Sequence, residues 1–154
     1  MKTTIAVALL AALALTGCGS ATDKEAARDN DFNHSERRLD VAQTNAAVNC
    51  RDQAQCDQVW QWTKTYVTQH SEEPVIRADA SAIESDVPGS SGHAVYSATR
   101  VAKGSGATIT LYAQCRGMYG PDRSMGSDYD ECVKKITTTQ NGFALYLEQH
   151  VSGN

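Results

Sequence analysis

The sequence lacks the features that assign a chain to several common classes. Its 154 residues carry a net charge of −4 and have an isoelectric point near 5.5, so it offers no basic surface for nucleic acid. Only 6% of the residues are aromatic and 41% are hydrophobic. That apolar share is slightly below the usual one, yet too high for a fully disordered chain. The length fits one small domain with additional segments, not two domains.

Catalytic and metal-binding motifs are missing as well. The turn at 89–93 (GSSGH) differs from the GxSxG elbow of serine hydrolases in the order around the serine, and no strand-to-helix turn is expected there. An EF-hand starting at Asp122 needs Asp or Asn at 124 and 126, glycine at 127 and glutamate at 133, where the chain has Ser, Gly, Ser and Val. We therefore assign no catalytic residue, no metal ligand and no cofactor.

The N-terminus carries the most specific signal in the chain. A short positive start with Lys2 precedes an apolar run at 5–15 (IAVALLAALAL). At about 1.5 Å per residue the run spans about 16 Å, half of a hydrocarbon core of roughly 30 Å. It is too short for a transmembrane helix and has the length of a signal-peptide core. The residues that follow, Leu15-Thr16-Gly17-Cys18, resemble the lipobox of bacterial lipoproteins.

This resemblance implies a processing route and a location. Residues 1–17 would be removed as a signal peptide, and Cys18 would carry a diacylglycerol on its sulfur and an acyl chain on its new amine. Each buried methylene contributes about 0.8 kcal/mol, so two or three chains hold a protein at a membrane. Gly19 stands where an inner-membrane retention signal has Asp, which by analogy favours the periplasmic face of the outer membrane. The alternative is an ordinary secretory signal in which Cys18 forms a disulfide.

The remaining cysteines agree with export. Without Cys18 the chain has Cys50, Cys56, Cys115 and Cys132, which allow three pairings. We expect the sequence-local pairs, Cys50 with Cys56 and Cys115 with Cys132, which close loops of about 7 and 18 residues. The chain-entropy model gives roughly 2.4 and 3.2 kcal/mol for such loops. The first spacing is not that of a zinc knuckle, and no histidine stands at zinc-finger spacing.

The mature chain divides into a tether and a domain. Within residues 18–48, the stretch 19–38 holds many charges of both signs and almost no large apolar residue besides Phe32. Such a segment buries too little surface to offset the entropy of ordering, so we expect a lipidated cysteine followed by a flexible tether. Leu39, Ala42 and Ala46 hint at a weak helix without deciding the matter. Residues 49–154 are expected to form a small domain with two disulfides.

The domain begins with a helix that the sequence predicts at 53–70. Asp52 and Gln55 have the spacing of a capping box. Apolar and small residues then recur at the spacing of one helical face: Cys56, Val59, Trp60, Thr63, Tyr66 and Val67.

Three antiparallel strand regions follow, and then an ambiguous segment. Residues 75–86 predict a bulged strand or two short strands, while 93–101 and 108–115 alternate as strands between glycine-rich turns. Residues 133–150 fit either a helix or a hairpin around the Asn-Gly pair at 141–142; the helix is favoured because its periodicity persists over about fifteen residues. The predicted fold is α+β: an N-terminal helix, a three- to four-stranded antiparallel meander and a C-terminal helix.

Four residues are candidates for partner binding. Trp62 lies at the margin of the predicted helix face, where it either covers the edge of the core or contacts a partner. Arg116, Met118 and Tyr119 follow a disulfide cysteine. A loop fixed in this way is either a preorganised recognition element or an ordinary connection.

Together these observations favour a lipid-anchored cell-envelope protein that acts as a non-enzymatic binding or accessory module. Its expected partners are the membrane, through the lipid, and an envelope protein or polymer, but not nucleic acid. One alternative is a small envelope hydrolase, which would require His93 or His70 beside a serine and a carboxylate in a cleft. The other is a structural surface lipoprotein with no defined ligand.

Overall fold

The computed structural model describes residues 19–151; the predicted signal peptide and Cys18 lie outside them. The chain divides into two units, which meet between His34 and Ser35. The described residues of the first unit, 19–34, are helical and belong to α1, Gly19–Asn45. The second unit contains the end of α1 and every other element.

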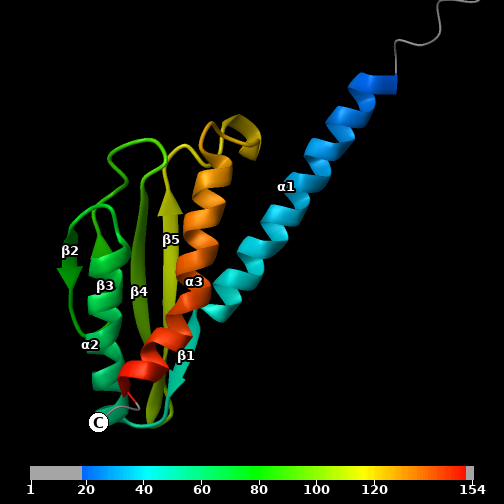
Figure 1. Cartoon of the computed structure of the whole chain (residues 1–154). Helices are drawn as coiled ribbons and strands as arrows, with labels where there is room; N and C mark the ends of the chain where they lie inside the picture. The colour runs from blue at the N-terminus through cyan, green and yellow to red at the C-terminus, as the bar shows by residue number, and fades with distance from the viewer. Residues whose placement is uncertain (1–18, 152–154) are drawn as a thin grey trace, which may run out of the picture. The chain divides into compact units, whose positions relative to one another are not determined.

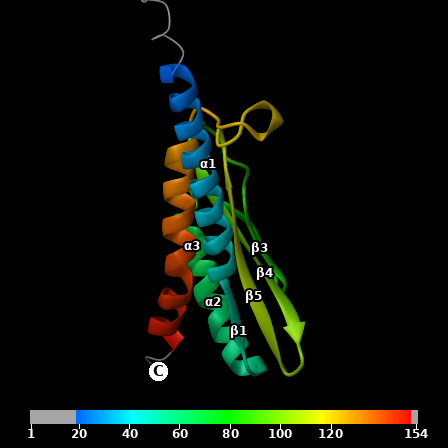
Figure 2. The ribbon, with the colours of Figure 1, turned by 90° about the vertical axis from the view of Figure 1, so that its right-hand side faces the viewer.

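The second unit is an antiparallel sheet with helices on one of its faces (Figures 1 and 2). Its strands run in the order β1-β5-β4-β3-β2, and all neighbours are antiparallel. The elements after α1 are β1 Ala47–Cys50, α2 Gln53–His70, β2 Val75–Ala78, β3 Ala82–Ser85, β4 Ala94–Lys103, β5 Gly106–Cys115, the short 3-10 helix η1 Pro121–Arg123 and α3 Tyr129–Val151. The predicted α+β class is confirmed, but the sheet has five strands instead of the expected three to four, because β1 adds a strand beside β5.

Helix α2 has the predicted boundaries because its cap is local. The side chain of Asp52 accepts a hydrogen bond of 2.9 Å from the backbone N–H of Gln55. The residues predicted to form its inner face are all buried. A capping interaction and a periodic apolar face are both short-range features, and this is why the sequence located the helix correctly.

Helix α3 resolves the ambiguity at 133–150 in favour of a helix. Gly142, which also suggested a turn, lies inside it. A Cβ at this position would stand 3.1 Å from the hydroxyl of Tyr66, and that hydroxyl donates a hydrogen bond of 2.7 Å to the carbonyl of Thr139. Burial raises the pKa of Tyr66 to about 12, so the hydroxyl keeps its proton. The glycine therefore permits close packing of α2 on α3.

The segment expected to be a flexible tether differs from that expectation. Instead of irregular chain, residues 19–50 form α1 and then β1. Ala42 and Ala46 are fully buried, the Gln43 amide donates to the Leu111 carbonyl at 3.0 Å, and β1 pairs with β5. These anchoring residues are small or polar, so hydropathy indicates them only weakly. Once one turn is fixed, helix propagation through polar sequence costs little.

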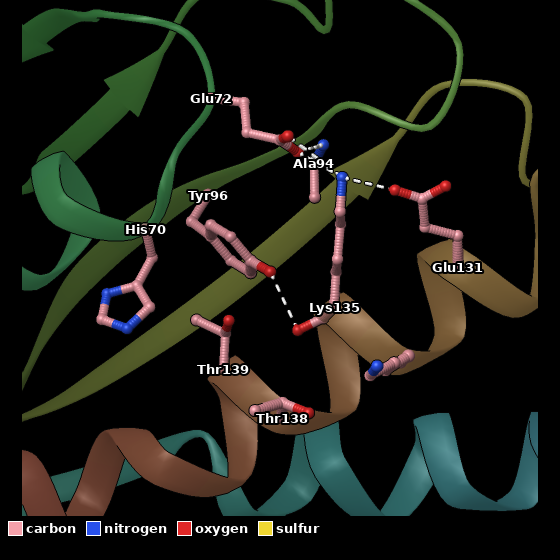
Figure 3. Close-up of a pocket in the computed structure, with 9 residues that line it drawn as sticks. His70, Glu72, Ala94, Tyr96, Glu131, Lys135, Thr138 and Thr139 are labelled. Carbon is pink, nitrogen blue, oxygen red and sulfur yellow. Dashed lines mark hydrogen bonds and ion pairs between the residues drawn. The ribbon is translucent and has the colours of Figure 1, made fainter.

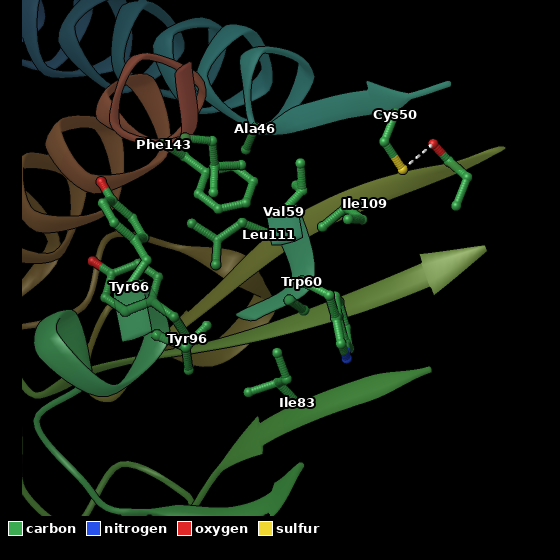
Figure 4. Packing of buried hydrophobic residues seen from close by; sticks show 14 of the residues in the cluster. Ala46, Cys50, Val59, Trp60, Tyr66, Ile83, Tyr96, Ile109, Leu111 and Phe143 are labelled. Atoms are coloured by element: carbon green, nitrogen blue, oxygen red, sulfur yellow. Dashed lines mark hydrogen bonds between the residues drawn. The ribbon is translucent and has the colours of Figure 1, made fainter. Parts of the chain in front are cut away.

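The core lies between the sheet and helices α2 and α3 (Figure 4). Along β5 the predicted alternation is present, with Ile109 and Leu111 fully buried. The aromatic rings of Trp60, Tyr96 and Phe143 fill much of the space between the two layers.

Two disulfides join helices to strands, with the predicted pairing. Cys50–Cys56 ties β1 to the first turn of α2 with a Cα–Cα distance of 5.1 Å. Cys115–Cys132 ties the end of β5 to the start of α3 with a distance of 5.7 Å. Two such bonds are consistent with an extracytoplasmic protein. Within residues 19–151, no helix has both the length and the apolar character needed to cross a membrane.

Candidate functional site

A cavity of about 500 Å³ opens between the end of α2, the first half of α3 and the start of β4. We call it the Lys135 cleft (Figure 3). Its floor is formed by the aromatic ring of Tyr96 and the methyl group of Ala94, and its rim is polar. It is lined by His70, Glu72, Ala94, Tyr96, Glu131, Lys134, Lys135, Thr138 and Thr139.

Lys135 forms one wall and is held by three groups. Its ammonium donates to the carbonyl of Gly92 at 2.7 Å, to Glu72 at 3.0 Å and to Glu131 at 2.9 Å. An ammonium has three donors, so its hydrogen-bonding capacity is fully used. Burial alone would lower the pKa of Lys135, but the two carboxylates outweigh it and raise the pKa. The side chain is therefore a fixed, charged part of the wall.

Glu72 links the segment after α2 to strand β4. Its Oε2 accepts a hydrogen bond of 2.6 Å from the backbone N–H of Ala94, and its own N–H donates to the Ala94 carbonyl at 3.0 Å. Burial alone would raise the pKa of Glu72. The hydrogen bonds from Ala94 and Lys135 reverse this effect and lower the pKa below its usual value. The carboxylate stays charged and keeps Lys135 in place.

His70 contributes a fixed imidazole to the rim. Its Nδ1 lies 2.9 Å from the carbonyl oxygen of Tyr66, and a carbonyl only accepts, so Nδ1 carries the hydrogen. The ring also stacks on Tyr66 with centroids 3.9 Å apart. Figure 3 shows it beside Tyr96 and Thr139. Nε2, which has no partner among the described residues, is an acceptor in the neutral ring and a donor in the protonated one.

The histidines and serines of residues 19–151 do not come together as a hydrolase would require. His93 Nδ1 lies 3.1 Å from a carboxylate oxygen of Glu73. The hydroxyl of Ser91 instead bonds to Asp128. A nucleophile–base pair needs the serine and the imidazole within hydrogen-bond reach, and no hydrogen bond joins these two residues. Within the same residues, no cluster of three potential metal ligands is present.

The residues proposed from sequence for partner binding fall at two separate places. Trp62 is half-buried on the seam between α2 and α3, where its ring lies 4.4 Å from that of His150. The residues after Cys115 mostly make internal contacts. Met118 is 5% exposed, Arg116 donates to the carbonyl of Gly89 at 3.0 Å, and the hydroxyl of Tyr119 donates to Glu36 at 2.9 Å.

Sequence reasoning missed the Lys135 cleft, although part of the signal was local. Glu131 and Lys135 are four residues apart on α3, a spacing that brings two side chains together on a helix. Glu72 comes from a different segment, 63 residues away, and His70 from the end of α2. No short-range pattern relates these segments.

The protein was compared with family models, curated proteins and solved structures, and none of the three gives a match.

Proposed function

We propose that the protein is a lipid-anchored cell-envelope protein that binds another envelope protein or polymer without catalysing a reaction, and that the Lys135 cleft is its contact site. One observation carries this proposal. The charged groups of the wall satisfy one another, which leaves His70 Nε2 and the exposed side chains of Lys134 and Thr138 for a ligand.

A wall held in this way favours recognition. Lys135 cannot turn toward a ligand without losing its acceptors, so the cleft keeps its shape before a partner arrives. Binding to a preorganised surface avoids the entropic cost of ordering side chains. The apolar floor formed by Ala94 and Tyr96 can take an aliphatic or aromatic group, while the rim supplies hydrogen bonds that fix its orientation.

The lipid anchor rests on the lipobox-like sequence, and the two disulfides agree with export. Intact-mass analysis of the native protein should show a product that begins at Cys18 and carries the mass of its acyl chains. The C18S variant should leave the membrane fraction with its two disulfides intact. A native product that is a bare polypeptide would contradict the anchor.

The contact site can be tested by photo-crosslinking in membranes. A photoreactive amino acid at Thr138 should give a defined adduct, and the adduct should weaken when His70→Ala is added. The same probe at Tyr112, an exposed residue of β5, is the matched control. Equal labelling from both positions, or none from Thr138, would contradict the proposed site.

A further inference from the structure

Arg100 is a charged residue on the core side of the sheet. Along β4 the side chains of Tyr96, Ala98, Arg100 and Ala102 share one face, because side chains alternate along a strand. Tyr96 and Ala98 are buried in the core, and the side chain of Arg100 is only 12% exposed. An arginine at an inward position is costly unless its donors find acceptors.

Two adjoining cavities surround this arginine. Their volumes are about 320 and 290 Å³, and both are bordered by Asp57, Ala80 and Arg100. We call them together the Arg100 cleft. It lies between the first half of α2, the turn from β2 to β3 and the end of the β4–β5 hairpin. The strand and turn residues around it are mostly small, which leaves the space open: Ala78, Ala80, Ala102, Gly106 and Ala107.

The guanidinium has one acceptor. Its Nη1 donates to Asp57 Oδ1 at 2.8 Å, and the described part of the chain supplies no second partner. A guanidinium has five N–H donors in a planar fork. No buried side-chain nitrogen within residues 19–151 lacks a hydrogen bond, so the unbonded nitrogens of Arg100 are accessible to solvent. Arg100 lines both cavities of the cleft. By contrast, the half-exposed Arg77 engages both Asp79 and Glu84.

The charges around the cleft leave room for an added anion. Asp57 is 53% exposed, contacts Arg100 through a single oxygen and also accepts from Gln53 at 3.0 Å. Asp79 is occupied elsewhere, by Arg77 and by the N–H groups that follow it. Lys64 adds a second positive charge to the lining.

We propose that the Arg100 cleft binds a ligand through a carboxylate, which accepts hydrogen bonds from the free edge of the guanidinium. Arginine forms paired, parallel hydrogen bonds with carboxylates, and these are among the stronger polar contacts in proteins. Asp57 holds one edge of the fork and acts as a weak internal competitor. The ligand is a small organic acid or the C-terminal carboxylate of a peptide. This site requires neither the lipid anchor nor the Lys135 cleft.

The test is an NMR titration of the purified exported protein, followed through the arginine Nε–H resonances. Succinate represents the free acids, and a short peptide with a free or an amidated C-terminus represents the other source. The Arg100 resonance should shift saturably with at least one carboxylate, and that of Arg77 should not. Binding by the free but not the amidated peptide would identify a chain terminus as the ligand group.

Three variants decide the assignment. Asp57→Asn should tighten binding by about two- to fivefold, the factor that corresponds to an exposed ion pair. Arg100→Gln should abolish binding, while Arg77→Gln should leave it unchanged. If Arg100→Gln fails to fold, Arg100→Lys keeps the charge without the fork and should weaken binding at least about tenfold. The proposal is overturned if no carboxylate saturates the wild type and Asp57→Asn, or if binding survives the Arg100 substitution.

Discussion

The two clefts that border α2 hold their cations in opposite ways. At the end of α2, the ammonium of Lys135 has Glu72, Glu131 and the Gly92 carbonyl as acceptors. At the first half of α2, the guanidinium of Arg100 has Asp57 alone. A saturated cation is part of the wall and stabilises the fold, whereas an unsaturated one keeps donors for a ligand. The number of acceptors, and not burial alone, separates the two roles.

Each cleft has a disulfide nearby, and removing these bonds should have the largest effects. Replacing Cys115 and Cys132 by alanine should lower the free energy of unfolding by roughly 3.2 kcal/mol. The same change at Cys50 and Cys56 should lower it by roughly 2.4 kcal/mol, since a shorter loop constrains the unfolded chain less. Urea denaturation of both variants measures the difference. The reverse order would show that strand–helix packing at the Arg100 cleft depends more on its disulfide.

Lys135→Met should destabilise the protein by about 1–2 kcal/mol. It leaves two carboxylates facing each other without the ammonium between them. Part of the network is solvent-screened, because the Lys135 side chain is 30% exposed, and the estimate is reduced accordingly. Chemical denaturation at pH 7 provides the measurement. An unchanged stability would mean that Lys135 does not hold the wall.

Arg100→Met is the matched substitution. It should change the free energy of unfolding less than Lys135→Met does, and any change should be toward higher stability. We expect stability within about 0.5 kcal/mol of the wild type, or slightly above it. The guanidinium loses one hydrogen bond, the apolar replacement fits the space beside Ala80 and Ala102, and the exposed Asp57 returns to water. A loss as large as that for Lys135→Met would remove the distinction between the two cations.

The stability difference between Lys135→Met and the wild type should also depend on pH. The pKa of Glu72 is lowered in the folded protein from its usual value of 4.5. Its contribution to stability is therefore present above pH 4.5 and is lost as the pH falls through the lowered folded-state pKa. The deficit of Lys135→Met relative to the wild type should shrink between pH 7 and pH 3. A deficit that stays constant would exclude Glu72 as the partner that matters.

The elements predicted correctly are those whose signals are short-range. The cap at Asp52 and the buried face of α2, the alternation of β5 and the periodicity of α3 each lie within fewer than twenty residues. The pairing of the cysteines follows the same rule. Strand β1 was not predicted, and the end of α1 was only weakly indicated by the sequence. The residues that anchor this region, among them Ala46 and Gln43, are small or polar.

From the sequence, candidate site residues could be chosen only by residue type, whereas the structure identifies them by their contacts. Trp62 and Tyr119 stand out by their chemistry, yet the first packs on the α2–α3 seam and the second bonds to Glu36. Arg100 carries a signal that could have been noticed, since it is the one charge among the inward positions from 94 to 102 of β4. From the sequence alone it is not known which face of β4 is covered, so the position of Arg100 could not be identified as inward.

Local pattern alone was enough to predict helix α2, the strands at 93–101 and 108–115 and the lipobox-like N-terminus, because each depends on neighbours in the chain. It also favoured α3 over a hairpin and the sequence-local cysteine pairs over the other two pairings, and the structure confirms both. Only the tertiary structure determines which of the two cations has acceptors for all of its hydrogen-bond donors. Glu72 reaches Lys135 across 63 residues and Asp57 reaches Arg100 across 43. Acceptors that meet a cation over such separations are brought there by packing of the helices on the sheet, and no short-range pattern encodes how many will arrive.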